Sequence, residues 1–321
     1  MGTRWPLAPD RPAKNAKRCA GRPARPGRRR EAAEAMKRTS PVHRRSVPKQ
    51  PKGSCLMLFA PLPAPRAGLH YKLSGTFGAP WLVFINSLAT DMRLWDPVIE
   101  RIGGRFRVLT YDKRGHGLSD TPPGPWSIAD LADDLLALAD HLRIERFALC
   151  GISVGGLIAQ DIAARAPERL SAVVFSNTGM KIGTDTVWND RLETARTQGM
   201  GALVGPTMER WFTEPFRADP ARLTPWHHMV SRSPVEGFIN TGAAIRDADY
   251  TGAAPSIRVP SLVIAGDQDG GTPPALGQAL AEAVPDAHLE VMEGVAHLPC
   301  VEDPDAYAVL LNTFIPEVAR R

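Results

Sequence analysis

Long apolar runs are absent from this sequence, and cysteine is scarce. No stretch of about 18 or more apolar residues occurs, which excludes an ordinary transmembrane helix. The four cysteines, Cys19, Cys55, Cys150 and Cys300, show no C-x-x-C spacing. We therefore expect no disulfide framework and no zinc site, and the reducing cytoplasm is the expected location. We interpret Cys150 and Cys300 as small buried packing residues.

Signatures of metal and phosphate binding are missing as well. His, Cys, Asp and Glu do not cluster at the spacings of metal ligands, and there is no Gly-rich phosphate loop. No apolar segment of a secretory signal follows the N-terminal charges. We expect neither a metal nor a cofactor, and no association with a membrane.

The formal net charge of +5 hides a strong asymmetry along the chain. Residues 1–56 hold 16 Lys/Arg and 3 Asp/Glu, whereas residues 57–321 hold 23 basic and 31 acidic side chains. The basic character therefore belongs to the N-terminal segment alone. An acidic body argues against nucleic-acid binding by the folded part of the chain.

The N-terminal segment, residues 1–56, is rich in Arg, Pro, Ala and Lys and has almost no aliphatic periodicity. Such a composition cannot offset the entropy of ordering, so we expect disorder. Three interpretations stay open: an Arg-rich targeting peptide, a basic interaction tail, or residues upstream of a true start at Met57 or Met36. We favour the last.

Residues 57–321 alternate between short apolar runs and helical patterns. A mostly parallel sheet with helices on both faces follows from this alternation, so the fold class is α/β. One long stretch breaks the alternation and contains Trp188, Trp211 and Trp226. We interpret residues 179–250 as a helical cap insertion over the edge of the sheet where ligands bind. The expected strands are 69–73, 81–85, 106–111, 147–150, 172–175, 261–265 and 289–292, and the expected helices are 128–142, with Ser127 as its N-cap, 154–165 and one from about 304.

Ser153 is the candidate nucleophile, because residues 151–155 fit the motif G-x-S-x-G. The glycines permit a sharp strand-to-helix turn that projects the serine hydroxyl into a site. The context fits, since a strand is expected before Ser153 and a helix after it. The alternative is an ordinary Gly/Ser turn.

A serine hydroxyl needs a base and an orienting acid, which follow it along the chain in enzymes with this elbow. His297 follows the last expected strand, so its loop can carry the imidazole to the serine. We set aside His227 and His228 in the insertion and His288 before a strand. After strand 261–265 both Asp267 and Asp269 qualify as the acid, and we favour Asp269, which is further into the loop. Asn177, after the preceding strand, holds no charge.

The oxyanion of an acyl-transfer intermediate needs N–H donors. The backbone N–H of Val154, directly after the nucleophile, is one candidate. The other should lie in the loop after strand 81–85, where we choose Leu88 N–H. His116 lies in the polar loop 112–119, and we favour a role in shaping that loop over catalysis.

Residues 69–316 resemble the α/β-hydrolase superfamily. The resemblance is carried by Asn86-Ser87, Trp95, the D-x-R-G-H-G-x-S pattern at 112–119, the Ser153 elbow, Gly266-x-x-Asp269 and Ala296-His297. The chain is similar in particular to the 3-oxoadipate enol-lactonases. The segments that carry this narrower resemblance are 86–88 with Asp91 and Trp95, 155–160, 176–178, 181–184, Trp188-Asn189, 209–213 and 243–249.

The narrower resemblance implies an enzyme that opens 3-oxoadipate enol-lactone in the breakdown of aromatic compounds, with the triad Ser153, His297 and Asp269. It implies no cofactor. The substrate is a small lactone or ester carrying a carboxylate, so a cation is expected in the pocket. Lys181, Arg191 and Arg246 are all candidates, and Trp188 and Trp211 are either pocket walls or insertion core.

Several rival functions remain open on the sequence. One is another hydrolase of the same fold: a carboxylesterase, a carbon–carbon bond hydrolase or a cofactor-free perhydrolase. A second is a ligand receptor without activity, and a third is an adaptor acting through residues 1–56. A dehalogenase is disfavoured because Ser153 stands where it would need Asp. The oligomeric state stays open.

Overall fold

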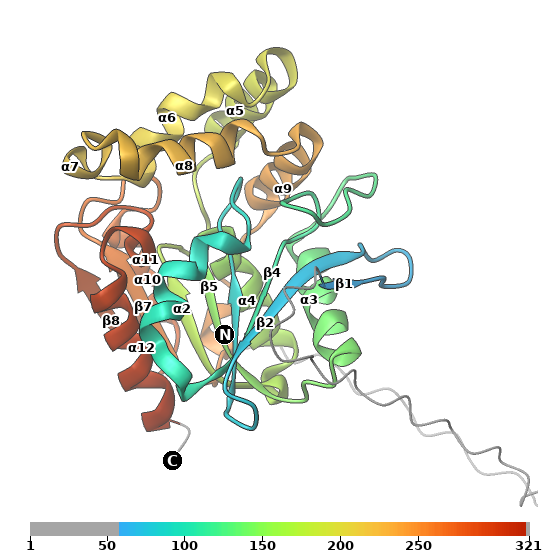
Figure 1. Cartoon of the computed structure of the whole chain (residues 1–321), viewed down its shortest axis with the longest axis vertical. Coiled ribbons are helices and arrows are strands. Elements are labelled where there is room, and N and C mark those ends of the chain that lie inside the picture. The colour runs from blue at the N-terminus through green and yellow to red at the C-terminus, as the bar shows by residue number, and fades with distance from the viewer. Residues whose placement is uncertain (1–57, 319–321) are drawn as a thin grey trace, which may run out of the picture. The chain divides into compact units, whose positions relative to one another are not determined.

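The computed structural model of the chain describes residues 58–318 (Figure 1). The expectations for residues 1–56 therefore lie outside the described part. The described residues form an eight-stranded sheet in the order β1-β2-β4-β3-β5-β6-β7-β8, in which only the β1–β2 and β2–β4 pairs are antiparallel. The strands are β1 (Leu58–Ala60), β2 (Leu69–Gly75), β3 (Trp81–Ile85), β4 (Arg107–Tyr111), β5 (Phe147–Ile152), β6 (Leu170–Ser176), β7 (Ser261–Gly266) and β8 (His288–Met292).

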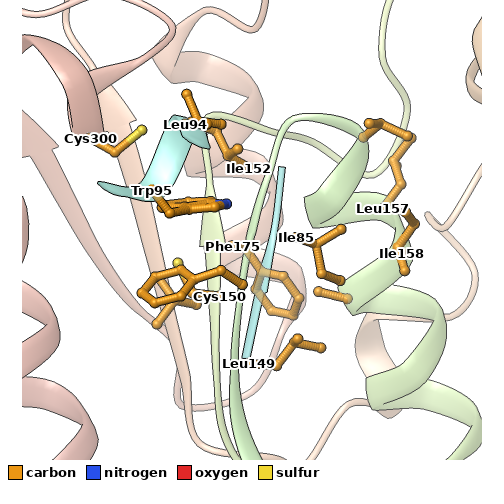
Figure 2. Packing of buried hydrophobic residues seen from close by; sticks show 14 of the residues in the cluster. Ile85, Leu94, Trp95, Leu149, Cys150, Ile152, Leu157, Ile158, Phe175 and Cys300 are labelled. Atoms are coloured by element: carbon orange, nitrogen blue, oxygen red, sulfur yellow. The ribbon is translucent and has the colours of Figure 1, made fainter. Parts of the chain in front are cut away.

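The central strands are buried because their side chains are apolar on both faces of the sheet. Every residue of β5 and β7 is buried, as expected of a parallel strand covered by helices on both sides. In Figure 2, Leu157 and Ile158 of the helix after β5 lie on one side of the strands, and Trp95 and Cys300 lie on the other. Cys150 and Cys300 are free thiols and fully buried, which confirms their interpretation as packing residues.

Helices cover both faces of the sheet. One group is α3 (Ile128–His141), α4 (Val154–Arg165) and α10 (Pro274–Ala283), and the other is α2 (Asp96–Ile102), α11 (Pro299–Glu302) and α12 (Pro304–Val318). In the first group α4 packs on β5 and β6, α10 packs on β7 and β8, and α3 packs on α4. In the other group α12 packs on β6, and α2 and α11 pack on α12. Short 3-10 helices complete the layers: η1 (Met92–Trp95), η2 (Gly103–Arg105), η3 (Pro167–Arg169) and η4 (Ala254–Ser256).

Five α-helices, followed by η4, and no strand lie between β6 and β7. The five α-helices gather over one end of the sheet (Figure 1), and we call them the cap. Trp226 packs against Phe212, whose ring stacks on that of Phe216 at 4.3 Å, so part of the cap has an aromatic core of its own. The cap helices are α5 (Asp185–Gln198), α6 (Gly201–Trp211), α7 (Glu214–Arg217), α8 (Pro220–Ser231) and α9 (Val235–Asp247).

The expected fold class is confirmed, and each expected strand and helix occurs with small shifts in its bounds. Ser127 caps α3 as expected and forms a capping box with Asp130. The edge strand β1 and the helices α2 and α10 were not expected. Parallel order places the loops after β3, β5, β7 and β8 at the same edge of the sheet, beneath the cap.

Candidate active site

A cavity of about 140 Å³ lies between the cap and the loops at that edge of the sheet. Six of its lining residues are candidates from the sequence. Ser153, His297 and Leu88 reach it from different loops of the sheet, and Trp188, Arg191 and Trp211 reach it from the cap. The cap supplies the opposite wall. The lining consists of Ser87, Leu88, Ala89, Ser153, Ile182, Gly183, Val187, Trp188, Arg191, Thr207, Arg210, Trp211, Phe238, Gly270, Gly271, Thr272 and His297.

Ser153 sits in the sharp turn between β5 and α4. Its φ of 59° and ψ of −118° are strained for a residue with a side chain. Glycine is required on both sides of the turn, because a Cβ on Gly151 would lie 2.1 Å from Gly155 O, and one on Gly155 would lie 2.4 Å from Ile85 O. The turn is held by Ser153 N, which donates to Ser176 O on β6 at 2.9 Å. The strain and the two glycines match a nucleophile elbow.

Asp269 and His297 are brought together from the loops after β7 and β8. His297 Nδ1 donates to Asp269 Oδ2 at 2.8 Å, and both side chains are buried. Because Nδ1 carries the donated hydrogen, Nε2 is the nitrogen left to accept a proton. Burial alone would raise the pKa of Asp269, but the His297 charge and hydrogen bonds from His297, Thr272 and Asn177 hold that pKa below its usual value.

Three further groups hold the Asp269 carboxylate, and sequence reasoning did not find them. Thr272 N donates to Oδ1 at 2.8 Å and Thr272 Oγ1 to Oδ2 at 2.7 Å, while Gly271 N donates to Oδ1 at 2.7 Å. Asn177 Nδ2 donates to Oδ2 at 2.9 Å, so an amide at the alternative acid position supports the acid itself. Asp267 is exposed and accepts from Val295 N.

The other histidines set aside above lie away from the cavity. His227, His228 and His288 are exposed. His116 is fully buried and shapes the loop after β3, because its Nε2 accepts from Ala89 N at 3.1 Å. Burial and the nearby Lys113 charge hold the pKa of His116 well below its usual value, so the ring is neutral.

Leu88 N–H and Val154 N–H are the two candidate oxyanion donors. In the part of the chain that the structure describes, neither has a hydrogen-bond partner. Val154 N–H is a free donor at the first residue of α4, where no intrahelical partner exists. Leu88 lines the cavity beside Ser153. Both amides thus lack a partner among the described residues, but Val154 itself is not part of the cavity lining.

Of the three candidate cations, only Arg191 lines the cavity. Its guanidinium lies over the Trp188 ring at 4.4 Å, and its Nε is buried with no hydrogen-bond partner among residues 58–318. Burial, with a smaller contribution from Arg210, lowers the pKa of Arg191 to about 9. Arg210, which sequence reasoning missed, lines the same cavity, and burial lowers its pKa as well.

Lys181 and Arg246 lie outside the cavity lining, contrary to their selection as candidates. Arg246 is engaged at the surface by Asp247 at 2.7 Å and by Asn189 at 2.8 Å. Lys181 is exposed. Trp188 and Trp211 are both buried in the cap core and line the cavity, so the two interpretations of them hold together.

Glu302, on α11, links the cap to the loop of His297, and it was not singled out in the sequence. Its carboxylate accepts from Ala296 N at 2.6 Å, directly before His297. It also accepts from Thr213 N at 2.9 Å and Thr213 Oγ1 at 2.7 Å, at the end of α6. Leu298 N donates to Trp211 O at 3.3 Å. Both neighbours of His297 are therefore tied to the cap.

Comparison with known proteins agrees with this geometry. The family model of the α/β hydrolase fold matches residues 80–198. The 3-oxoadipate enol-lactonase 2 of Acinetobacter baylyi is 38% identical over 247 residues, which cover 77% of this chain and 92% of that protein. This chain belongs to the α/β-hydrolase superfamily.

Within this superfamily the chain is similar to enol-lactonases in structure as well as in sequence. The crystal structure of the enol-lactonase from Burkholderia xenovorans LB400 has a TM-score of 0.76 and 38% identity, and the match covers 78% of this chain and 97% of that one. The putative carbamate hydrolase RutD of Agrobacterium fabrum is 28% identical, with 77% of this chain and 98% of that protein covered. Among residues 58–318 no helix is long and apolar enough to span a bilayer.

Proposed function

We propose that this hydrolase opens 3-oxoadipate enol-lactone to 3-oxoadipate, with Ser153, His297 and Asp269 as its triad, in the breakdown of aromatic compounds. The observation that carries the proposal is that one cavity holds both an elbow serine and Arg191, a largely buried arginine with no ion-pair or hydrogen-bond partner among residues 58–318. An anionic ester is the ligand that satisfies both. The similarity to enol-lactonases of 38% identity supports the specific lactone.

The chemistry follows from the positions of the donors. His297 Nε2 takes the proton of Ser153 Oγ as Oγ attacks the lactone carbonyl carbon. Leu88 N–H and Val154 N–H stabilise the resulting oxyanion. The ring C–O bond then breaks, the leaving enolate takes the proton from His297 Nε2 and becomes the ketone, and the acyl chain stays on Ser153. Water, deprotonated by His297, attacks the acyl carbon and releases 3-oxoadipate.

The free carboxylate of the substrate is held by Arg191, with Arg210 beside it. A guanidinium without an anionic partner is costly to keep in a site that excludes water, and a substrate carboxylate would relieve that cost. Trp188 holds the Arg191 guanidinium by a cation–π contact, which fixes the orientation of the guanidinium before substrate binds. Trp188 and Trp211 wall the cavity around the apolar part of the lactone.

The first test follows the ultraviolet absorbance of the enol-lactone, with Ser153→Ala in parallel. We expect turnover by the wild type and a loss of at least about 10³-fold in the variant. Absence of lactone turnover, together with Ser153-dependent cleavage of p-nitrophenyl acetate, would retain the triad and exclude the lactone. Inactivity on both substrates would favour a ligand receptor on the same scaffold.

A second candidate is hydrolysis of a carbamate, because the similarity to the putative carbamate hydrolase spans 98% of that protein. The same preparation, assayed for ammonia release from carbamate, distinguishes the two. We expect the lactone to be turned over far faster. The reverse order of rates would replace the first proposal with the second.

A further inference from the structure

Lys113 is a buried cation close to the candidate oxyanion donors. It lies directly after β4, in the loop 112–119, and its side chain is 1% exposed. Lysine is almost never buried so completely unless its charge has a use or a partner. Burial lowers the pKa of Lys113 to about 7, while the charges of Asp112 and Asp91 act in the opposite direction.

The ammonium of Lys113 is directed at one carbonyl. Its Nζ donates to Ser87 O at 2.8 Å, and this is the hydrogen bond that the ammonium makes among the described residues. The same oxygen accepts from Thr90 Oγ1 at 2.9 Å. Thr90 N also donates to this oxygen, at 3.4 Å. The two shorter side-chain hydrogen bonds and this longer backbone one together fix the direction of the Ser87 carbonyl.

That carbonyl belongs to the peptide unit that ends in Leu88 N–H. The cis peptides of the described residues lie elsewhere, at Ala64-Pro65 and Gly124-Pro125, so the Ser87–Leu88 peptide is trans. In a trans peptide the C=O and N–H point in opposite directions. Fixing Ser87 O on Lys113 thus turns Leu88 N–H away from Lys113. This N–H has no partner within the described chain, and Leu88 lines the cavity with Ser153.

We propose that Lys113 is a positioning residue of the oxyanion hole, which orients and polarises the Ser87–Leu88 peptide so that Leu88 N–H donates strongly to the developing oxyanion. This inference rests on the proposed role of Ser153 as nucleophile. A cation on the carbonyl oxygen draws electron density from the peptide and makes its N–H a better donor. Lys113 itself touches neither the substrate nor the reacting atoms.

The groups around Lys113 leave its charge available to the peptide. Asp112 is occupied by His70 Nδ1 at 2.8 Å, Met92 N at 2.8 Å and Leu118 N at 2.9 Å. Asp91 is paired with Arg93. His116, on the other side of the loop, is neutral and accepts from Ala89 N. Since the pKa of Lys113 is about 7, its charge is lost as pH rises through neutrality, and kcat should fall with it.

The test uses p-nitrophenyl acetate, so that it does not depend on the identity of the lactone. Lys113→Met removes the charge at similar volume. We expect kcat to fall about tenfold or more with KM little changed. Removal of a whole oxyanion donor lowers kcat by about 10²–10³-fold, and in this variant one donor is present but misdirected. The wild type should lose activity above about pH 7, and the variant should lack that descending limb. Inhibition by phenylboronic acid, which forms an anionic adduct with serine, should weaken by the same factor as kcat.

Thr90→Val supplies an independent second variant, since it removes the other side-chain donor to Ser87 O. We expect a smaller fall in kcat, of about threefold, because the charged donor remains. Thr224→Val, in which an exposed Oγ1 bonded to Pro220 O is removed from the cap, is the matched control and should be silent. Should Lys113→Met fail to fold, the kcat of Thr90→Val decides whether the orientation of the Ser87–Leu88 peptide matters for catalysis.

Two results would overturn the inference while leaving the proposed function intact. One is Ser153-dependent hydrolysis with the same kcat in both variants as in the wild type. The other is an unchanged descending limb in Lys113→Met. No Ser153-dependent hydrolysis of any ester would instead overturn the nucleophile, and the inference with it.

Discussion

Replacing Arg191 by Met should make the protein more stable and a worse enzyme at the same time. Arg191 is a largely buried cation with an orphaned Nε and no acidic partner among the described residues. Met keeps most of the side-chain volume and removes the charge. The empty site then loses a desolvated charge, while the occupied site loses the partner of the substrate carboxylate.

The two effects have different sizes. Replacing buried charges by apolar groups of similar volume stabilises proteins by about 1–4 kcal/mol. Loss of the contact between Arg191 and Trp188, at 4.4 Å, destabilises the variant by about 1 kcal/mol. We therefore expect the free energy of unfolding to rise by up to about 3 kcal/mol. A hydrogen bond to a charged group is worth about 1.5–3 kcal/mol, so kcat/KM for the lactone should fall about 10- to 150-fold.

Urea denaturation measures the first effect, and kcat/KM on the enol-lactone and on neutral p-nitrophenyl acetate measures the second. Only the anionic substrate should suffer. Arg246→Met is the matched control, because that arginine is held at the surface by Asp247 and Asn189 outside the cavity. An equal loss on both substrates, or an unchanged rate on the lactone, would refute the role of Arg191 in carboxylate recognition.

The remaining predictions concern the acid and the clamp on the His297 loop. Asp269→Asn should lower kcat about 10⁴-fold with little change in KM, because an amide stabilises the wrong imidazole tautomer; a loss under tenfold would point to another acid. The pKa of Asp269 is lowered in the folded protein, so its stabilising contribution is present above the unfolded value of about 4 and is lost as pH falls through the lower folded value. Urea denaturation between about pH 5 and pH 2 should therefore show a weaker pH dependence in Asp269→Asn than in the wild type, and equal slopes would contradict the shift. Glu302→Gln should lower kcat about tenfold and the free energy of unfolding by about 1–3 kcal/mol, since an amide nitrogen must face either Ala296 N or Thr213 N. Its control is Glu193→Gln, which changes an exposed glutamate paired with Arg196. Equal kinetics of the two variants would exclude a role of Glu302 in holding the His297 loop.

The central sheet was predictable because its signals are local. The apolar run at 81–85 and the G-x-S-x-G turn each contain enough information within a few residues to indicate a buried strand and an elbow. Asp269 and His297 followed from their order after strands, and the structure joins them at 2.8 Å. The short strand β1 escaped prediction, because its 3 residues carry too little pattern.

The supporting residues could not be predicted, because their partners lie far away in sequence. Asn177 bonds Asp269 across 92 positions, and Glu302 bonds Thr213 across 89. No spacing in the sequence indicates such pairs. The cap cations posed a different difficulty: Lys181, Arg191 and Arg246 are alike in charge, and only the packing of the helices decides which of them faces the cavity.

Three residues that break local rules lie around one edge of the sheet and the cap above it. Ser153 has a strained backbone, Arg191 has no acidic partner among residues 58–318, and the buried position of Lys113 disfavours its charge. Each of these features costs stability. A sheet whose central strands are completely buried can offset such costs, and selection for folding alone would remove them. Their concentration around one cavity is therefore an argument for chemistry at that place, independent of any similarity to known enzymes.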